Sequence, residues 1–171
     1  MKDFSNYWRA LTYAVDKYKT LTRKHGPPYI VHPIRMTSIL RAVGFSEFVQ
    51  EDMMIAALLH DLLEDTDITV EEIRNQFGKK VASIVKELTK PEQINKDEWL
   101  KSLETASNEA KIIKMADRID NLMDMNSGVW SIEKQKSYAE QGKIILEKCG
   151  SAHSDLAFKL NETIEKVLKS S

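Results

Sequence analysis

Hydrophobic residues recur at three- and four-residue spacing along most of the chain, which is the period of an amphipathic α-helix. The first such stripe is made of Phe4, Trp8, Leu11, Val15 and Tyr18. It predicts a helix from about residue 4 to about residue 22. No segment alternates between polar and apolar residues over a sustained length, so we expect no β-sheet.

Residues that start and stop helices divide the following stretch. The segment RKHGPPY (residues 23–29) combines a glycine with two prolines and predicts a loop. Pro33 is well placed to open a second helix, which Gly44 would close. Ser46 is the predicted N-cap of the helix that follows.

The second half of the chain reads in the same way. Thr69 and Glu72 form a capping box for a short helix ending at Gly78. The next helix is expected to end at about Thr89, because Pro91 follows, and another lies around Trp99–Thr105. Ser107 is expected to cap a helix from Glu109 to about Met125. The last two helices are expected from Ser131 to Cys149 and from Asp155 to Lys169. The predicted fold class is all-α: one domain over residues 1–171, a bundle of about eight to ten helices.

The stretch AALLHDLLEDT (residues 56–66) begins as core helix and then changes character. On a helical wheel its leucines fill one arc, and the opposite side carries His60, Asp61, Glu64 and Asp65. The upstream part of that polar side is small and apolar. Such a face suits the wall of a cleft, although a solvated face of an amphipathic helix is the alternative.

The helix predicted from Glu109 has a similar division. Its core side is expected to hold Ile112, Met115, Ile119, Leu122 and Met123. Its other side is expected to hold Lys114, Asp117, Asp120, Asn121 and Asp124. Asp117 and Asn121 are four residues apart, so their side chains share one face.

Two imidazoles and two carboxylates stand out as possible ligands of a divalent transition metal: His32, His60, Asp61 and Asp117. His32 precedes a proline, which disfavours helical geometry, so we expect its side chain to project from a helix entrance. Nearby acids would add negative charge that a cation could balance. On spacing alone, ordinary surface or core roles for these side chains remain open.

Composition narrows the choice of partners. The 171 residues include 25 basic and 26 acidic side chains, a net charge of −1, so no global charge attracts nucleic acid or membrane. The longest apolar run, Met53 to Leu59, is too short to span a bilayer. A lone cysteine, Cys149, allows no internal disulfide. With no secretory signal at its start, the chain is expected to be cytoplasmic.

Three quoted motifs, RKHGPPYIVHP, AALLHDLLEDT and KMADRIDNL, together resemble the HD-domain hydrolase family, in the (p)ppGpp hydrolase branch of the RelA/SpoT proteins. The resemblance runs from the first helix to Tyr138 and is strongest to the small stand-alone hydrolases of that branch. It implies a site for Mn²⁺ whose ligands are His32, His60, Asp61 and Asp117. It also implies that Glu64 and Asp65 position and activate the attacking water.

The same resemblance implies the contacts with the nucleotide. Arg23 is expected against the base and Lys24 near phosphate, although this pair alone would be an ordinary basic loop. Asn121 and Tyr138 are expected to contact the substrate, although Tyr138 could instead be packed between helices. Trp130 and Tyr138 resemble a W-x-x-x-x-x-x-x-Y element near the pocket, and Lys134 lies between the two in sequence.

The resemblance predicts Mn²⁺-dependent hydrolysis of the 3′-pyrophosphate of ppGpp or pppGpp, so the expected partner is a small-molecule nucleotide. Two residues depart from the family pattern, Tyr18 in the first helix and Asp124 near the pocket, and they leave the preferred nucleotide open. The alternatives are another HD phosphohydrolase, acting on NADPH or a nucleoside monophosphate, and a non-catalytic module that senses a nucleotide.

Overall fold

The computed structural model describes residues 5–24, 26–125 and 129–170, and this part of the chain is helical. Its helices are α1 (Ser5–Lys17), α2 (Val31–Ala42), α3 (Glu51–Leu59), α4 (Leu62–Asp65), α5 (Val70–Phe77), α6 (Lys79–Leu88), α7 (Lys96–Ser102), α8 (Asn108–Met123), α9 (Ile132–Cys149) and α10 (Ser154–Ser170). Short 3₁₀ helices cover Leu103–Thr105 and Gly150–Ala152. The only β pairing among the described residues is an isolated bridge between Thr22 and Pro28. The all-α prediction is confirmed.

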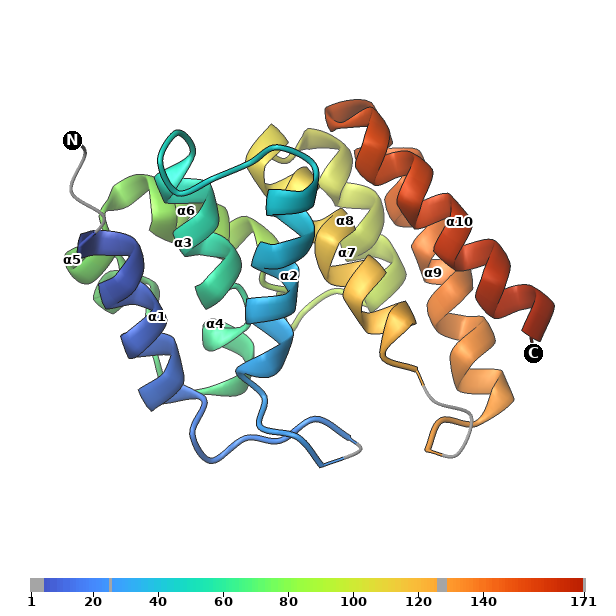
Figure 1. The fold of residues 1–171 in the computed structure, drawn as a ribbon, viewed down its shortest axis with the longest axis horizontal. Helices are drawn as coiled ribbons and strands as arrows, with labels where there is room; N and C mark the ends of the chain where they lie inside the picture. Colours follow the sequence, from blue (N-terminus) through green and yellow to red (C-terminus); the bar gives the residue numbers. More distant parts are fainter. Residues whose placement is uncertain (1–4, 25, 126–128, 171) are drawn as a thin grey trace. The chain divides into compact units, whose positions relative to one another are not determined.

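The chain divides into two compact units, Met1–Lys90 and Pro91–Ser171. In the first unit α3 packs against α1, α2 and α6, and α5 packs on α6 (Figure 1). Every residue of α3 from Met53 to Leu59 is buried, because helices of the unit surround it. A helix enclosed in this way carries apolar residues all round rather than a single stripe.

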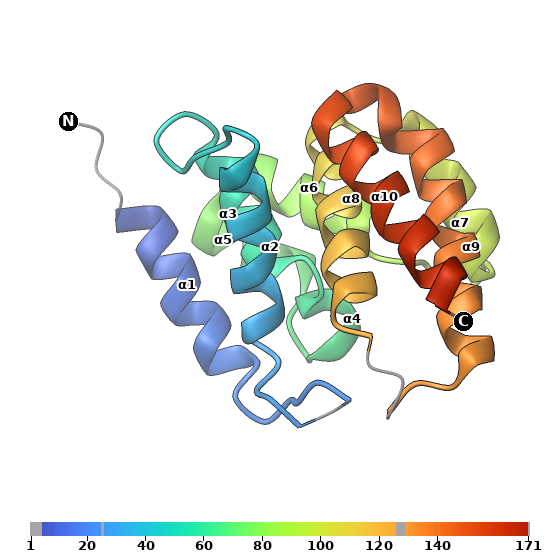
Figure 2. The same cartoon turned by 45° about the vertical axis from the view of Figure 1, so that its right-hand side comes forward.

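In the second unit α8, α9 and α10 pack pairwise on one another, and α7 packs on α9 (Figure 2). Gly142 of α9 permits a close approach to α10. A Cβ atom at this position would lie 3.0 Å from two side-chain carbons of Ile164. The backbones of α9 and α10 therefore come together where a side chain is missing.

The prediction for the first helix needs correction. Trp8 and Val15, placed in the apolar stripe, are 57% and 47% exposed, and Phe4 lies outside the described residues. The buried face instead holds Tyr7, Ala10 and Ala14. The alanines allow α1 to approach α3 closely, so small residues form the interface where the periodicity favoured large ones. The helix also ends at Lys17, earlier than predicted.

The start of α2 differs from the prediction too. The helix begins at Val31, so His32 lies inside its first turn rather than ahead of it. The N–H of His32 donates to the carbonyl of Tyr29 over 2.9 Å. Pro33 is tolerated one residue later because an N–H in the first turn has no partner within the helix.

Ser46 is not the N-cap of α3, as the sequence predicted. The helix begins at Glu51, after Gln50. Ser46 belongs to a preceding turn, in which its carbonyl accepts the N–H of Gln50 over 2.8 Å and its own N–H donates to the Gln50 side chain over 3.1 Å. Gln50 therefore holds both backbone groups of Ser46, and the helix starts only after that turn.

The other capping predictions are confirmed. Thr69 and Glu72 form the complete capping box of α5, which ends at Gly78 with φ at +93°. Ser107 accepts an N–H from the first turn of α8, as predicted. Ser131, predicted as the first residue of its helix, is instead the N-cap of α9, which begins at Ile132. These devices act over three residues, so neighbouring sequence is enough to specify them.

The two-sided prediction for α8 is only partly correct. Every residue from Ile112 to Asp120 is buried, including Lys114 and Asp117 on the predicted polar side. Met123, predicted in the core, is 64% exposed at the end of the helix. Burial on both sides means that each charged group of α8 needs a polar partner.

None of the described helices combines the length and the apolar composition that crossing a bilayer requires.

Candidate functional site

The helix predicted through residues 56–66 is interrupted at the His-Asp pair. Helix α3 ends at Leu59, His60 and Asp61 form a turn, and α4 begins at Leu62. The Nδ1 atom of His60 lies 3.0 Å from the carbonyl oxygen of Ala57, which the side chain takes in place of a regular helical bond. The prediction that both acidic pairs share one continuous helix is therefore wrong, because a side chain competes with the backbone at this point.

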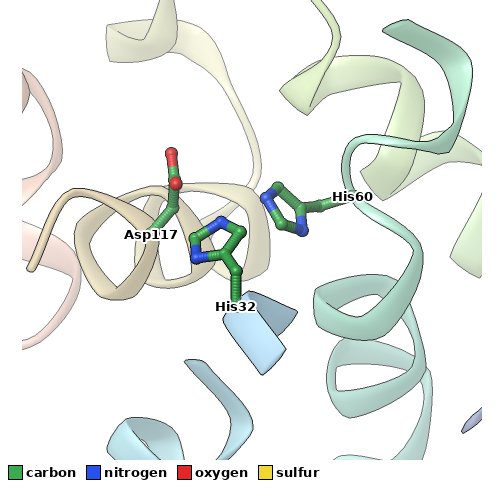
Figure 3. A group of neighbouring side chains, drawn as sticks. All are labelled: His32, His60 and Asp117. Carbon is green, nitrogen blue, oxygen red and sulfur yellow. The ribbon is translucent and has the colours of Figure 1, made fainter. Parts of the chain in front are cut away.

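The interruption gathers three ligand-type atoms within the first unit. The Oδ2 atom of Asp61 lies 2.8 Å from Nε2 of His60 and 3.9 Å from Nε2 of His32. The two imidazole rings meet edge to face with their centroids 5.1 Å apart (Figure 3). His32 and His60 are 1% and 2% exposed, so these rings are held in the core.

The hydrogen bond of His60 decides what its other ring nitrogen can do. A carbonyl oxygen only accepts, so Nδ1 of His60 carries the proton that points at Ala57. In a neutral imidazole the Nε2 atom then presents its lone pair to the Asp61 carboxylate. Two ligands of one transition metal, each at about 2.0–2.2 Å, stand about 3 Å apart. The donor atoms and their spacing therefore fit a divalent cation.

Two tyrosines lie next to Asp61, the buried Tyr18 and the partly exposed Tyr29. The hydroxyl of Tyr29 donates to Oδ2 of Asp61, and the ring of Tyr18 lies 5.1 Å from that of Tyr29. Burial, and then the charge of Asp61, raise the pKa of both phenols well above their usual range, so Tyr29 remains a donor. Tyr29 lies within the RKHGPPYIVHP motif, but nothing in the sequence indicated this contact with Asp61. Tyr18, the departure from the family pattern, packs in this supporting layer.

The two acids proposed for catalysis follow the turn. Asp65 and Glu64 are both exposed as residues. The N–H of Lys90 donates to Oε1 of Glu64 over 2.7 Å, so this carboxylate is anchored after the end of α6. Partial desolvation of its carboxyl, and then the charge of Asp61, raise the pKa of Asp65 to about 6. Such a carboxyl can exchange a proton near neutral pH.

The basic loop forms a tight hairpin ahead of α2. The N–H of Arg23 donates to the carbonyl of Pro27 over 2.8 Å, and the N–H of Gly26 returns to the carbonyl of Arg23 over 2.9 Å. The guanidinium of Arg23 lies 5.8 Å from the centroid of the Tyr29 ring. The loop thereby ties Arg23 to the tyrosine that bonds Asp61, while Lys24 is exposed.

In the second unit, Asp117 projects from α8 and is 5% exposed (Figure 3). Its Oδ2 atom lies 2.8 Å from the ammonium of Lys114, and its Oδ1 atom accepts a hydrogen bond from the amide of Asn121. The Lys114 ammonium also lies 4.6 Å from the centroid of the Trp99 ring. These contacts hold both oxygen atoms of the carboxylate in place.

A second constellation of this unit surrounds Tyr138 on α9. Its ring lies 5.6 Å from that of Trp130, and the cationic groups of Lys96, Arg118 and Lys134 lie within 5.2 Å of its centroid. Sequence reasoning did not find Lys96 or Arg118. Lys96 belongs to α7, far from Tyr138 in sequence, and Arg118 has the spacing of an ordinary helical residue.

Each unit thus brings part of the predicted site together. The first unit joins His32, His60 and Asp61, with Arg23 linked to them through Tyr29. The second unit joins Asp117 to Asn121, and Tyr138 to Trp130 and Lys134.

Comparison with known proteins agrees with this reading. The family model for the HD domain matches residues 10–147. The chain is 30% identical over 167 residues to guanosine-3′,5′-bis(diphosphate) 3′-pyrophosphohydrolase MESH1 of Drosophila melanogaster, covering 92% of each protein. It is 36% identical over 141 residues to the Homo sapiens protein of that name, covering 77% of each.

A solved structure described as "A metazoan ortholog of SpoT hydrolyzes ppGpp and plays a role in starvation responses" matches the fold with a TM-score of 0.85. The two chains are 29% identical, and the match covers 97% of each. The chain therefore belongs to the HD-domain hydrolase family, in the branch whose curated members are named guanosine-3′,5′-bis(diphosphate) 3′-pyrophosphohydrolases.

Proposed function

We propose that this enzyme is a Mn²⁺-dependent pyrophosphohydrolase that removes the 3′-diphosphate of ppGpp or pppGpp. Hydrolysis would yield pyrophosphate and GDP or GTP. The observation that carries the proposal is the convergence of His32, His60 and Asp61 within the motif residues, with donor spacing suited to one cation. The activity named for the relatives supplies the substrate.

We infer that the metal ligands are His32, His60, Asp61 and Asp117. Two imidazoles and two carboxylates suit a divalent transition metal, and Mn²⁺ follows from the family resemblance. Of these residues His32, His60 and Asp117 are buried, and each offers one donor atom. A bound divalent metal lowers the pKa of a coordinated water from ~16 toward ~7 and stabilises charge on phosphoryl oxygens. In this proposal both units contribute ligands, and residues 1–171 act as one domain.

Glu64 and Asp65 are proposed to orient the attacking water and accept its proton. The bond from the Lys90 N–H fixes one carboxylate oxygen of Glu64, which limits the positions open to the other. Asp65 has a pKa of about 6, and a base is most effective when its pKa lies near the working pH. The two acids follow the His60–Asp61 turn after Leu62 and Leu63, so they are close in sequence to two proposed ligands.

The nucleotide is proposed to bind through both basic and polar groups. Arg23 already stacks against Tyr29, and a planar guanidinium can also stack on a nucleobase. Lys24 is exposed and would bind phosphate. In the second unit the amide of Asn121 and the ring of Tyr138 would contact the substrate. The ammonium groups of Lys96 and Lys134 beside that ring supply positive charge suited to a phosphate.

Incubation of the purified protein with ppGpp and MnCl₂ tests the proposal. Chromatography should show GDP and pyrophosphate in equal amounts, and EDTA should stop the reaction. NADPH and GMP are assayed in parallel under the same conditions. Faster release of phosphate from either of them would point to another nucleotide phosphohydrolase. Binding of ppGpp without turnover, in protein shown by elemental analysis to contain metal, would point to a sensing module.

The compartment is proposed to be the cytoplasm, where a free thiol is stable. The single cysteine, Cys149, is buried and is not part of a disulfide. Burial raises its pKa to about 11, so the thiol is poorly reactive.

A further inference from the structure

Arg118 carries a positive charge into the core of the second unit. The residue is only 2% exposed. Its guanidinium carbon lies 4.7 Å from the centroid of the Tyr138 ring, and its Nη1 atom donates to the carbonyl oxygen of Tyr138 over 2.9 Å. One side chain of α8 therefore holds both the ring and the backbone of a single residue of α9.

The rest of the guanidinium is poorly satisfied. Among the described residues no carboxylate lies within ion-pair distance of Arg118, although the charge of Asp117 attracts the guanidinium, and the buried Nε atom has no hydrogen-bond acceptor. A buried charge without such partners is unfavourable, and an apolar side chain of similar volume would stabilise the fold more. The charge is therefore better explained by what it does to Tyr138 than by its contribution to stability.

The stem of Arg118 is confined as well. Gly142 follows Tyr138 by one turn of α9, and a Cβ atom at Gly142 would lie 3.6 Å from Cγ of Arg118. The arginine stem thus passes beside the glycine, and its head lies over the tyrosine ring. With stem and head both held, Arg118 has little freedom to change rotamer.

The other cations near Tyr138 differ in this respect. Lys134 is exposed and Lys96 partly exposed, and each reaches the ring through a flexible four-carbon stem. Tyr138 itself is partly exposed, so part of its surface is accessible to a ligand. Arg118 is therefore the buried, confined cation of the group, and the two lysines reach the ring from positions with more contact with solvent.

We propose that Arg118 is a positioning residue, which sets the orientation of the Tyr138 ring and thereby the affinity for the nucleotide. The inference rests on the proposed function in one respect, namely that Tyr138 contacts the substrate. Arg118 acts through Tyr138 and takes no part in bond cleavage. Its loss should therefore raise KM and leave kcat and metal content close to those of the parent enzyme.

The kinetic test compares Arg118→Met, Arg118→Lys, Tyr138→Ala and the double variant Arg118→Met/Tyr138→Ala in the Mn²⁺-loaded enzyme. Arg118→Met should raise KM for ppGpp by up to about tenfold, because a Tyr138 ring that is no longer held must be ordered when the nucleotide binds. Arg118→Lys, which keeps the charge, should recover most of that loss. If Arg118 acts through Tyr138, the KM of the double variant should not exceed the higher of the two KM values of the single variants.

A second measurement does not depend on turnover. In protein labelled with ¹³C in its tyrosine rings, the Tyr138 signal is assigned from the Tyr138→Ala spectrum. Arg118→Met should shift and broaden this signal, because the ring loses its fixed neighbour. If Arg118→Met does not fold, Arg118→Gln replaces it in both measurements, since Gln keeps an N–H donor without the charge.

The two measurements separate the two proposals. A parent enzyme that leaves ppGpp intact would reject the proposed function, and the tyrosine spectrum would still decide the role of Arg118. An unchanged Tyr138 signal in the arginine variant would overturn the positioning role. Increases in KM that multiply in the double variant would also overturn it, because independent residues have additive free energies.

Discussion

The two units treat buried polar groups in opposite ways. In the first unit, ligand-type atoms face one another: Oδ2 of Asp61 lies 2.8 Å from Nε2 of His60, and the neutral hydroxyl of Tyr29 supports it. In the second unit, a carboxylate and an aromatic ring each meet a cation, Asp117 beside Lys114 and Tyr138 beneath Arg118. The first arrangement is suited to receive a positive ion. The second already contains positive charges, and around Tyr138 these suit an anion, whereas its carboxylate Asp117 remains a proposed metal ligand.

The two units also differ in where along the backbone their polar site residues lie. The first unit presents its polar residues where helices start or stop, at the first turn of α2, at the His60–Asp61 turn and in the hairpin before α2. The second unit presents them from within long helices, α8 and α9. Side-chain bonds therefore shape the first group of residues, and helix packing places the second. Substitutions should separate metal binding in the first unit from nucleotide binding and helix stability.

Removing Asp61 should have the largest effect. Asp61→Ala deletes the carboxylate that lies near both histidines, so metal content and turnover should both be lost. Elemental analysis and a ppGpp assay on one preparation measure the two. Asp67→Ala, which removes an exposed acid a few residues away, is the matched control and should keep both. Near-stoichiometric metal with intact turnover in Asp61→Ala would count against this ligand set.

Glu64→Gln should separate chemistry from binding. The amide oxygen of Gln can still accept the Lys90 N–H, so fold, metal content and ppGpp affinity should be preserved. Loss of a general base should lower kcat by roughly 10²–10⁴. Calorimetry and single-turnover kinetics measure affinity and rate. If the variant binds metal and ppGpp and hydrolyses at the parent rate, Asp65 must act alone. Glu64→Ala, which also loses the Lys90 bond, controls for anchoring.

Lys24→Ala should have a smaller effect, on the substrate alone. A charge-assisted contact with phosphate is worth about 1.5–3 kcal/mol, so KM should rise about tenfold or more while metal content stays constant. Lys19→Ala is a suitable control, because that exposed ammonium is paired with Asp16 at 2.9 Å. Steady-state kinetics of both variants measure the difference. Equal KM values for the Lys24→Ala and Lys19→Ala variants would show that Lys24 is an ordinary basic loop residue without a contact to phosphate.

The smallest effects should come from the helix caps. Ser131→Ala in the second unit and Thr69→Ala in the first each remove a side chain that accepts a first-turn N–H. Each should lower the free energy of unfolding by about 1 kcal/mol and leave turnover close to that of the parent. Urea unfolding monitored by circular dichroism measures the loss. A cap variant that loses most of its activity at unchanged stability would show that the cap has a role beyond the helix.

Much of the secondary structure could be read from local sequence. The capping box of Thr69 and Glu72 and the cap at Ser107 lie where the sequence predicts them. Each involves groups at most three residues apart, so no distant contact can alter the outcome. His32 and His60, which the motifs singled out, do lie together in the first unit, because the family pattern already encodes their proximity.

Other features needed the tertiary structure. Periodicity favoured Trp8 for the core, but the buried residues of α1 are Tyr7 and two alanines, and α1 packs on α3. The shape of the neighbouring helix determines which face of α1 is buried. The helix of residues 56–66 is interrupted because the His60 side chain takes the Ala57 carbonyl. A wheel drawn from sequence assumes an unbroken helix and cannot show this competition.

The sequence by itself determined the helical class, most helix caps and the residue types of a metal site, because these depend on propensity, short-range hydrogen bonds and recognisable motifs. Only the tertiary structure decided which groups support them. Tyr29 reaches Asp61 across 32 residues, and Arg118 reaches Tyr138 across 20. Such contacts depend on how helices distant in sequence pack, and packing is decided by the shapes of both surfaces at once.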